Sequence, residues 1–448
     1  MILMKKIVLI FLILITSVNA SEVIELLSNS PKSLDNEVFR EIDVTKAKKY
    51  KTFHIPYKAN PDLNTLRYYF YRDLFKNKPK ENNSYFVKPK QNSYEFEFET
   101  IENKFVKKQL QTKGILSYLY YEDGKIIINE VSPKERLGKF FNDETKFRSN
   151  SMGKSLASYV LGNAICEGYI DSIDSRINDW DLVKNTLYEN QKLIDLLNMT
   201  AGDEKYVYDS HMLEKGRVNR LKKNNVDDWT IKIIMDWFKN TKPSKKRIYS
   251  YNVVNTQLIF NYILFKTGDD NFQKLLNKVF QEKVKIKNFA VFYRNNRNAF
   301  FSTDIDDKLS LEGDAHNMFY ATRFDYLRIA KAIMDDYQNN TCVGKYLKEI
   351  YDRRIPKGVD MSGDGKRGEP QFNRTYSYGG QFHLDYPGIR DKIVFGLGGY
   401  GGKAILIDVE DSRIVVVNTI HFNHDRYKYN VKKLLINPIK HGKKSFEK

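Results

Sequence analysis

The spacing of apolar positions changes twice along the chain, which predicts β structure near both ends and helices between them. Residues 115–121 and 125–131 are β-type apolar runs, and Asp123-Gly124 between them is a typical hairpin turn. Between residues 175 and 300 the apolar positions recur mostly at helical spacing. The clearest predicted helices are 229–238, 256–265 and, further on, 324–337.

After residue 370, glycine-rich turns separate short β-type runs. These runs are 392–395, 404–409 and 413–420, and residues 410–412 join the last two as a hairpin. We therefore predict an α+β fold, in which distant N- and C-terminal segments build one antiparallel sheet and a mostly helical lobe is inserted between them.

The first twenty residues predict an export signal. Lys5 and Lys6 precede an apolar run from Ile7 to Val18, and Ala20 supplies a small residue for cleavage. The run is shorter than the about 20 residues that cross a bilayer comfortably. We expect cleavage after Ala20, a periplasmic or secreted protein, and no stable membrane insertion once residues 1–20 are removed.

The remaining chain divides into three segments that differ in composition and in the pattern of apolar residues. Residues 21–110 are predicted to be an N-terminal extension of unassigned structure, 111–430 the patterned domain, and 431–448 a basic C-terminal tail. Only Cys166 and Cys342 are present, so at most one disulfide forms. A buried free thiol at Cys166 is the alternative.

The net charge of +18 does not come from one basic motif, because lysines and arginines are scattered through the chain. We therefore expect no nucleic-acid partner. With 41% hydrophobic and 14% aromatic residues the chain can fill a substantial core, which excludes a disordered protein. The oligomeric state is left open.

A Ser-x-x-Lys spacing at the start of a predicted amphipathic helix, 155–170, is the strongest chemical signal. Ser151 and Lys154 would share one helical face. A serine hydroxyl becomes nucleophilic when a base takes its proton, and a lysine in a buried or cationic environment can be that base. The helix start would add N–H groups for an oxyanion. The spacing alone is weak, since it recurs from Ser445 to Lys448.

Other motifs follow in a fixed order. They are Glu-Gly-Tyr-Ile at 167–170, Asp-Leu-Leu-Asn-Met-Thr-Ala-Gly at 195–202, Tyr-Asn-Val-Val-Asn-Thr at 251–256 and Gly-Gly-Tyr-Gly-Gly-Lys at 398–403. Together with 151–155 they resemble the class C β-lactamase-like and penicillin-binding-protein-like serine hydrolases. The resemblance covers about residues 114–420 and is closest to the branch of 6-aminohexanoate-dimer hydrolases and related esterases.

The resemblance implies a β-lactamase/transpeptidase-like fold and a hydrolase that cleaves an amide or ester bond of a small or peptide-like substrate through an acyl-serine. It implies Ser151 as nucleophile, Lys154 as base and Tyr251 as proton shuttle, with the backbone N–H groups of Ser151 and Tyr400 holding the oxyanion. The further substrate-binding candidates are Gly399, Gly401, His316, Asn317 and Glu204.

No cofactor or metal is expected. The pattern Gly-x-Gly-x-x-Gly at 396–401 is followed by a β-type run, so it offers no helix N-terminus to a dinucleotide. The sequence contains no His-Glu-x-x-His and no paired-cysteine motif.

Two departures from the family leave alternatives open. Val253 stands where the family has Asn or Ser, and Leu397 stands where β-lactamases and penicillin-binding proteins place Lys or His. We therefore expect uncharged or cationic amides and esters as substrates. The alternatives are a catalytically inactive binding protein of the same fold, or a D-Ala-D-Ala carboxypeptidase or β-lactamase. Tyr249 is the nearest rival of Tyr251.

Overall fold

The computed structural model describes residues 41–43, 45–50, 55, 59–71, 84–207, 235–236, 238–293, 318–358, 374–420 and 428–447. The α-helices are α3 (Leu63–Tyr71), α4 (Lys104–Thr112), α5 (Met152–Cys166), α6 (Leu193–Leu197), α7 (Glu204–Val207), α10 (Val254–Thr267), α11 (Asp269–Leu276), α12 (Arg323–Gln338), α13 (Cys342–Asp352) and α14 (Asn437–His441). Shorter 3₁₀ or π turns are η4 (Gly138–Phe140), η5 (Asp181–Val183), η6 (Asn277–Lys283), η10 (Lys432–Ile436) and η11 (Gly442–Phe446).

The strands form two sheets. They are β1 (Ser84–Val87), β2 (Glu97–Phe98), β3 (Ile115–Glu122), β4 (Lys125–Val131), β5 (Phe147–Arg148), β6 (Ala290–Tyr293), β7 (Phe319–Ala321), β8 (Ile355–Pro356), β9 (Ser377–Gly379), β10 (Phe382–Leu384), β11 (Val394–Gly399), β12 (Lys403–Asp408) and β13 (Arg413–Thr419). The large sheet has the order β2-β4-β3-β13-β12-β11-β10-β9-β8, and the small sheet β1-β6-β7-β5.

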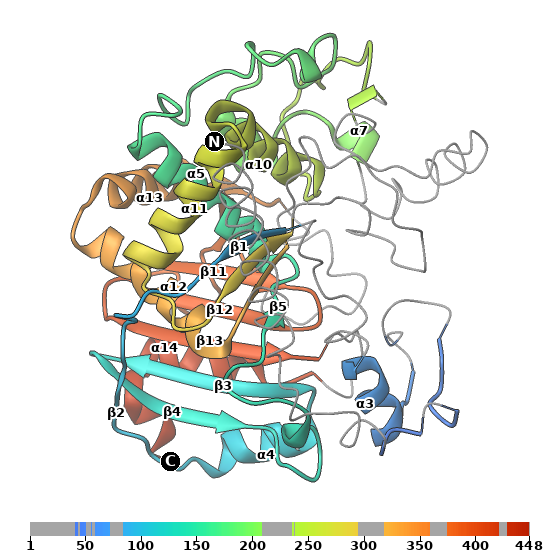
Figure 1. Ribbon diagram of the computed structural model, residues 1–448, viewed down its shortest axis with the longest axis vertical. Coiled ribbons are helices and arrows are strands. Elements are labelled where there is room, and N and C mark those ends of the chain that lie inside the picture. The colour runs from blue at the N-terminus through green and yellow to red at the C-terminus, as the bar shows by residue number, and fades with distance from the viewer. Residues whose placement is uncertain are drawn as a thin grey trace, which may run out of the picture.

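Distant segments meet in the large sheet, as predicted (Figure 1). Strand β3 pairs antiparallel with β4 through Leu119 and Asn129, and with the C-terminal β13 through Leu119 and Val416. The β3–β4 turn has positive φ angles at Asp123 (47°) and Gly124 (90°), the pair of conformations that a two-residue type I′ turn requires. The mostly helical segment between β4 and β11 is the predicted inserted lobe.

Most predicted elements are confirmed within a few residues. The helices expected at 256–265 and 324–337 lie within α10 and α12, and the strands expected at 404–409 and 413–420 correspond to β12 and β13. The helix predicted at 229–238 falls mostly outside the described residues.

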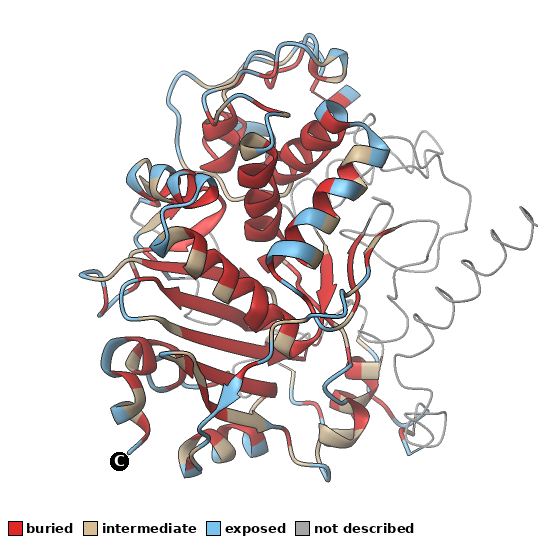
Figure 2. Cartoon of the chain, turned by 60° about the vertical axis from the view of Figure 1, so that its left-hand side comes forward, coloured by how far each residue is buried: buried red, intermediate tan, exposed pale blue. Residues whose placement is uncertain are grey.

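Helix α5 differs from the prediction of an amphipathic helix. It is buried on all sides, with only Ile165 and Cys166 partly exposed. Figure 2 shows several helices beside the sheet that are buried along most of their length. The reason is tertiary: α10, α11 and α13 contact it around its circumference, and β11 and β12 lie beneath it. It also ends earlier than predicted, because Gly168 (φ 77°) turns the chain in the left-handed conformation that commonly ends helices.

Helices cover both faces of the large sheet. One face packs against α5 and α12, and the other packs against α4 and the C-terminal helical turns. The segment expected to be a basic tail, 431–448, is therefore packed against the domain, since Leu434, Leu435 and Ile439 are fully buried there. The hydroxyl of Tyr118 on β3 donates to the Leu434 carbonyl at 2.7 Å.

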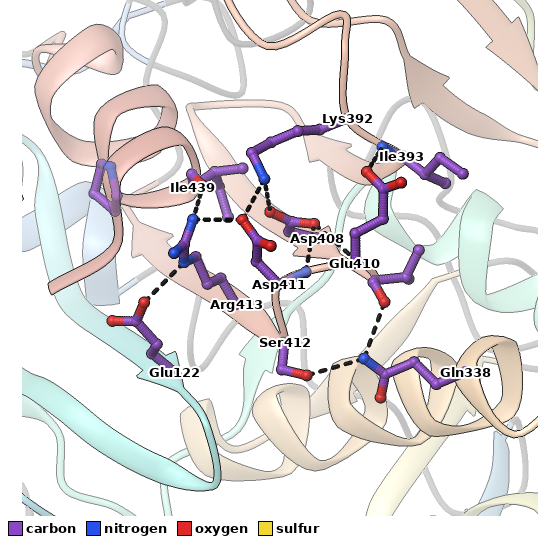
Figure 3. Close-up of polar contacts among 12 residues, drawn as sticks. Glu122, Gln338, Lys392, Ile393, Asp408, Glu410, Asp411, Ser412, Arg413 and Ile439 are labelled. Carbon is purple, nitrogen blue, oxygen red and sulfur yellow. Dashed lines mark hydrogen bonds and ion pairs between the residues drawn. The ribbon is translucent and has the colours of Figure 1, made fainter.

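Polar contacts fix the far end of the β12–β13 hairpin (Figure 3). The ammonium of Lys392 pairs with Asp408 at 3.2 Å and with Asp411. The guanidinium of Arg413 donates to Glu122 at the end of β3 at 2.8 Å. Asp408 is fully buried, and the side chains of Lys392, Arg413 and Glu122 are only 13–17% exposed, so we interpret these contacts as fixing the register of β3 against β13.

A disulfide joins the C-terminal residue of α5 to the first residue of α13. Cys166 and Cys342 are bonded, with their Cα atoms 5.9 Å apart. The alternative of a buried free thiol is therefore wrong. In the part of the chain that the structure describes, no helix is long and apolar enough to span a membrane.

Candidate active site

The nucleophile candidate stands at a turn held by the small sheet. Strand β5 pairs with β7, and just beyond it the Ser149 N–H donates to the Phe319 carbonyl at 2.7 Å. Asn150 then adopts a left-handed conformation (φ 49°), which reverses the chain so that Ser151 becomes the N-cap of α5. The Ser151 hydroxyl makes no capping hydrogen bond, which leaves it available to other groups.

Lys154 lies one helical turn further on, and its ammonium donates to the Ser151 hydroxyl at 3.1 Å. The lysine is only 3% exposed. Its Nζ also lies 5.1 Å from the centre of the Tyr251 ring. The three residues that the motifs singled out thus meet at the start of α5, although 100 positions of sequence separate Ser151 from Tyr251. An amine beside a serine hydroxyl can accept its proton.

Tyr251 is positioned by its neighbour Asn252. The Asn252 side chain is fully buried; it donates to the Ser250 carbonyl at 2.8 Å and accepts from the N–H of Asn255 at 3.0 Å. The Ser250 N–H in turn donates to the Met199 carbonyl at 2.9 Å. The Leu-Leu-x-Met-Thr element and the tyrosine motif are therefore joined by backbone and side-chain hydrogen bonds.

A buried carboxyl, Asp203, stands behind this segment. It accepts from the Tyr188 hydroxyl at 2.8 Å and from the Asn252 amide at 3.3 Å. The pKa of Asp203 is raised to about 7, mainly by burial and in the same direction by the Glu204 carboxylate, while the Tyr188 hydrogen bond opposes the shift. Glu204, a predicted substrate-binding residue, begins the short helix α7 directly beside it.

The glycine-rich motif packs against the turn formed by Ser149, Asn150 and the nucleophile candidate Ser151, called the nucleophile turn below. The Asn150 side-chain amide donates to the Tyr400 carbonyl at 2.9 Å. A Cβ at Gly399 would come within 2.6 Å of the Ser149 carbonyl oxygen, so only glycine fits there without movement. Gly401 follows with a φ of 85°, in the turn between β11 and β12. This close approach puts Tyr400 next to the turn that carries Ser151.

The two departures from the family motifs have structural explanations. Leu397 on β11 is 1% exposed, pairs with Ile405 and belongs to the hydrophobic core, so a charged residue would be buried at this position. Val253 is the N-cap of α10 and makes no side-chain capping hydrogen bond. Its neighbour Asn252 makes the polar contacts of this turn instead.

The sequence interpretation missed a basic pair beside Tyr251. The ammonium of Lys357, just after β8, donates to Thr375 at 2.6 Å and to Nδ1 of His383 on β10 at 2.9 Å. The His383 ring stacks on that of Tyr251, with centroids 6.2 Å apart. Burial, and next the charge of Lys357, hold the pKa of His383 well below its usual value. Both Lys357 and His383 lie outside every sequence motif.

The remaining predicted site residues are only partly accounted for. His316 and Asn317 lie outside the described residues. The rival tyrosine, Tyr249, packs against Tyr378 with ring centroids 5.2 Å apart. Its ring lies near Lys357, whereas the ring near Lys154 is that of Tyr251.

Comparison with solved structures identifies the fold. A Bacillus anthracis protein assigned as a 6-aminohexanoate-dimer hydrolase superposes with a TM-score of 0.58 at 15% sequence identity, over 89% of this chain and 99% of that one. The chain has the β-lactamase/transpeptidase-like fold. This confirms the predicted α+β class and the predicted fold family. No family model matches the sequence. No curated protein matches it either.

Other solved structures of this fold are also similar. A D-stereospecific amidohydrolase from Streptomyces sp. has a TM-score of 0.49 at 13% identity, over 76% of this chain and 99% of that one. A penicillin-binding protein from Bacillus halodurans has a TM-score of 0.47 at 14% identity, over 72% of this chain and 96% of that one.

Proposed function

We propose that this protein is a serine hydrolase that cleaves an amide or ester bond through an acyl-serine intermediate. The observation that carries the proposal is the 3.1 Å hydrogen bond between the buried Lys154 amine group and the Ser151 hydroxyl at the start of α5. The fold supports it, because a structurally similar protein is assigned as a hydrolase of 6-aminohexanoate dimers. Fold alone does not fix an activity, so the proposal depends on the chemistry of the site.

In the proposed reaction, neutral Lys154 accepts the Ser151 proton as Oγ attacks the substrate carbonyl carbon. The carbonyl oxygen gains negative charge and is held by the N–H groups of Ser151 and Tyr400. Tyr251 passes the proton to the leaving amine or alcohol, and the carbon–nitrogen or carbon–oxygen bond breaks. Water then attacks the carbonyl carbon of the acyl-serine and gives a proton to the base. The base passes this proton to Ser151 Oγ as the carbon–Oγ bond breaks and the acid is released.

We also propose that the protein is exported, with residues 1–20 as a signal peptide and the hydrolase domain spanning 111–430. The disulfide between Cys166 and Cys342 supports this, because such bonds form and persist in oxidising compartments outside the cytoplasm. Mass spectrometry of the mature protein tests the proposal. An N-terminus at Ser21 and an intact disulfide are expected, whereas a protein that retains residues 1–20 in the cytoplasm would contradict it.

A fluorophosphonate probe tests the hydrolase proposal directly, since it modifies only an activated serine. We expect one adduct, on Ser151, and loss of labelling in Ser151→Ala and Lys154→Met. Ser445→Ala is the matched control, because Ser445 starts the other Ser-x-x-Lys spacing and should not affect labelling. Folded protein without an adduct on Ser151 would favour the inactive binding protein instead.

A panel of p-nitrophenyl esters and amides, run on wild type and Ser151→Ala together, measures turnover. Hydrolysis by the wild type that the variant lacks supports the reaction. Hydrolysis that persists at the same rate in Ser151→Ala would place the chemistry elsewhere. Including a cephalosporin and a D-Ala-D-Ala peptide in the panel discriminates the β-lactamase and carboxypeptidase alternatives.

A further inference from the structure

A continuous row of contacts leads from the edge of the large sheet to the nucleophile. Lys357 contacts Nδ1 of His383 at 2.9 Å, and the His383 ring stacks on Tyr251 at an interplanar angle of 28°. The Tyr251 ring lies 5.1 Å from Nζ of Lys154, which contacts the Ser151 hydroxyl at 3.1 Å. Each of the five side chains in this row carries a group that can donate or accept a proton.

The outer residues of the row are buried, and the hydrogen bond between them has a defined donor and acceptor. Lys357 is 8% exposed and His383 5% exposed. An ammonium group has only donors, so Nδ1 of His383 accepts, which fixes the ring as the tautomer protonated on Nε2. Burial and the two lysines together lower the pKa of His383, which keeps the ring neutral. Lys357 is therefore the charged group at the outer end of the row.

We propose that Lys357, acting through His383, is a positioning and electrostatic residue for the Ser151–Lys154–Tyr251 site. Lys357 supplies a fixed positive charge near the site. Strand β11 supplies none at position 397, because Leu397 belongs to the hydrophobic core. This inference rests on the proposed hydrolase function. It assigns a role to a residue that belongs to no motif and directly follows β8, the edge strand on the other side of the sheet from β3 and β4.

The electrostatic argument has a definite sign. A positive charge near an amine favours the neutral form of that amine, which is the form that accepts the serine proton. The same charge favours loss of a proton from a nearby tyrosine hydroxyl. Both effects act in low-dielectric surroundings, where charge interactions are stronger than in water. Lys357 thereby promotes catalysis at pH values where Lys154 would otherwise be protonated.

Groups on several elements face this row. They are Tyr249 before α10, Tyr378 on β9, and Asp203, which contacts Asn252 next to Tyr251. Lys403 on β12 lies nearby and donates to the Arg148 carbonyl, three residues before Ser151, at 3.0 Å. The Tyr378 ring contacts both Tyr251 and His383, and burial raises its pKa well above its usual value, so it stays neutral.

Lys357→Gln tests the proposal, because glutamine can still donate to Thr375 and His383 but carries no charge. The measurement is the second-order rate of fluorophosphonate labelling of Ser151 between pH 5 and 10. We expect the acid limb of this profile to move to higher pH by about 0.5–1 unit, and the rate on that limb to fall about three- to tenfold. Above the limb the rate should approach that of the wild type.

Two variants separate charge from structure. Lys357→Arg keeps the charge and should restore the wild-type profile, while Lys283→Met is the matched control, since Lys283 contacts α5 through Asn163 without entering the row. If Lys357→Gln does not fold, Lys357→Met is a second variant that removes the charge, and it also removes the hydrogen bonds to Thr375 and His383. An unchanged profile in either neutral, folded variant overturns the proposal.

The outcomes also separate this inference from the proposed function. If wild-type Ser151 is not labelled at any pH, the hydrolase proposal fails first. If wild type is labelled but the neutral variants keep its pH profile, only the role of Lys357 fails. A rise in KM confined to anionic esters, with an unchanged profile, would instead make Lys357 a binding residue for a substrate carboxylate, and would overturn the positioning role.

Discussion

The contact between Gly399 and the nucleophile turn predicts the effect of adding one methyl group. In Gly399→Ala the new Cβ would lie 2.6 Å from the Ser149 carbonyl oxygen, 3.1 Å from Lys403 and 3.2 Å from Met152. Carbon and oxygen atoms in contact normally lie about 3.3 Å apart, so β11 and the turn must separate by roughly 0.7 Å. The atom in the way is backbone, which cannot rotate aside.

The magnitude follows from this displacement. Overpacking costs about 1–3 kcal/mol of the free energy of unfolding, and a misplacement of about 1 Å can cost 10²-fold in rate. We therefore expect Gly399→Ala to lower the rate of acylation of Ser151 about 10- to 50-fold in the protein that remains folded. The urea midpoint should fall as well.

The assay compares two glycines with similar clashes. A Cβ at Gly162, three turns along α5, would lie 2.5 Å from the Tyr346 ring. Gly162→Ala should also lower stability, but its labelling rate per folded molecule should match wild type because the clash lies away from Ser151. Equal labelling rates in wild type and Gly399→Ala would refute the conclusion that β11 sets the position of the nucleophile turn.

Three further predictions concern stability and proton transfer. Replacing both Cys166 and Cys342, whose bond closes a loop of 176 residues, by serine should lower the free energy of unfolding by about 2–5 kcal/mol; an unchanged urea midpoint would contradict this. Because the folded pKa of Asp203 is raised from 3.8 to about 7, wild type should lose stability as the pH rises through that window and Asp203→Asn should not; parallel curves would argue against it. Tyr251→Phe should reduce ester turnover about 10²- to 10³-fold without unfolding the protein, and full turnover would exclude the shuttle role.

Local patterns in the sequence were sufficient for much of the fold. The Asp123-Gly124 pair predicted its hairpin because few residue pairs adopt two successive positive φ angles. Helical spacing predicted α10 and α12, and β-type runs predicted β12 and β13. The order of the motifs predicted the β-lactamase-like fold and brought Ser151, Lys154 and Tyr251 forward as candidates.

Other features depended on which segments meet. Helix α5 has polar residues such as Asn163 and Ser158, which suggested an exposed face, but helices from distant parts of the chain cover it. The C-terminal segment read as a basic tail because lysines separate its apolar residues, yet Leu434 and Leu435 fill the second face of the sheet.

The sequence by itself determined that Ser151 and Lys154 meet, because a Ser-x-x-Lys spacing on a helix places both side chains on one face whatever surrounds it. Only the tertiary structure decided which other residues lie close to Ser151 and Lys154. Lys357 contacts His383, which stacks on Tyr251, because β8 and β10 lie in one sheet, although Lys357 and His383 are 26 residues apart in the sequence. Such contacts leave no periodic or local trace, since their distances depend on strand order and not on sequence spacing.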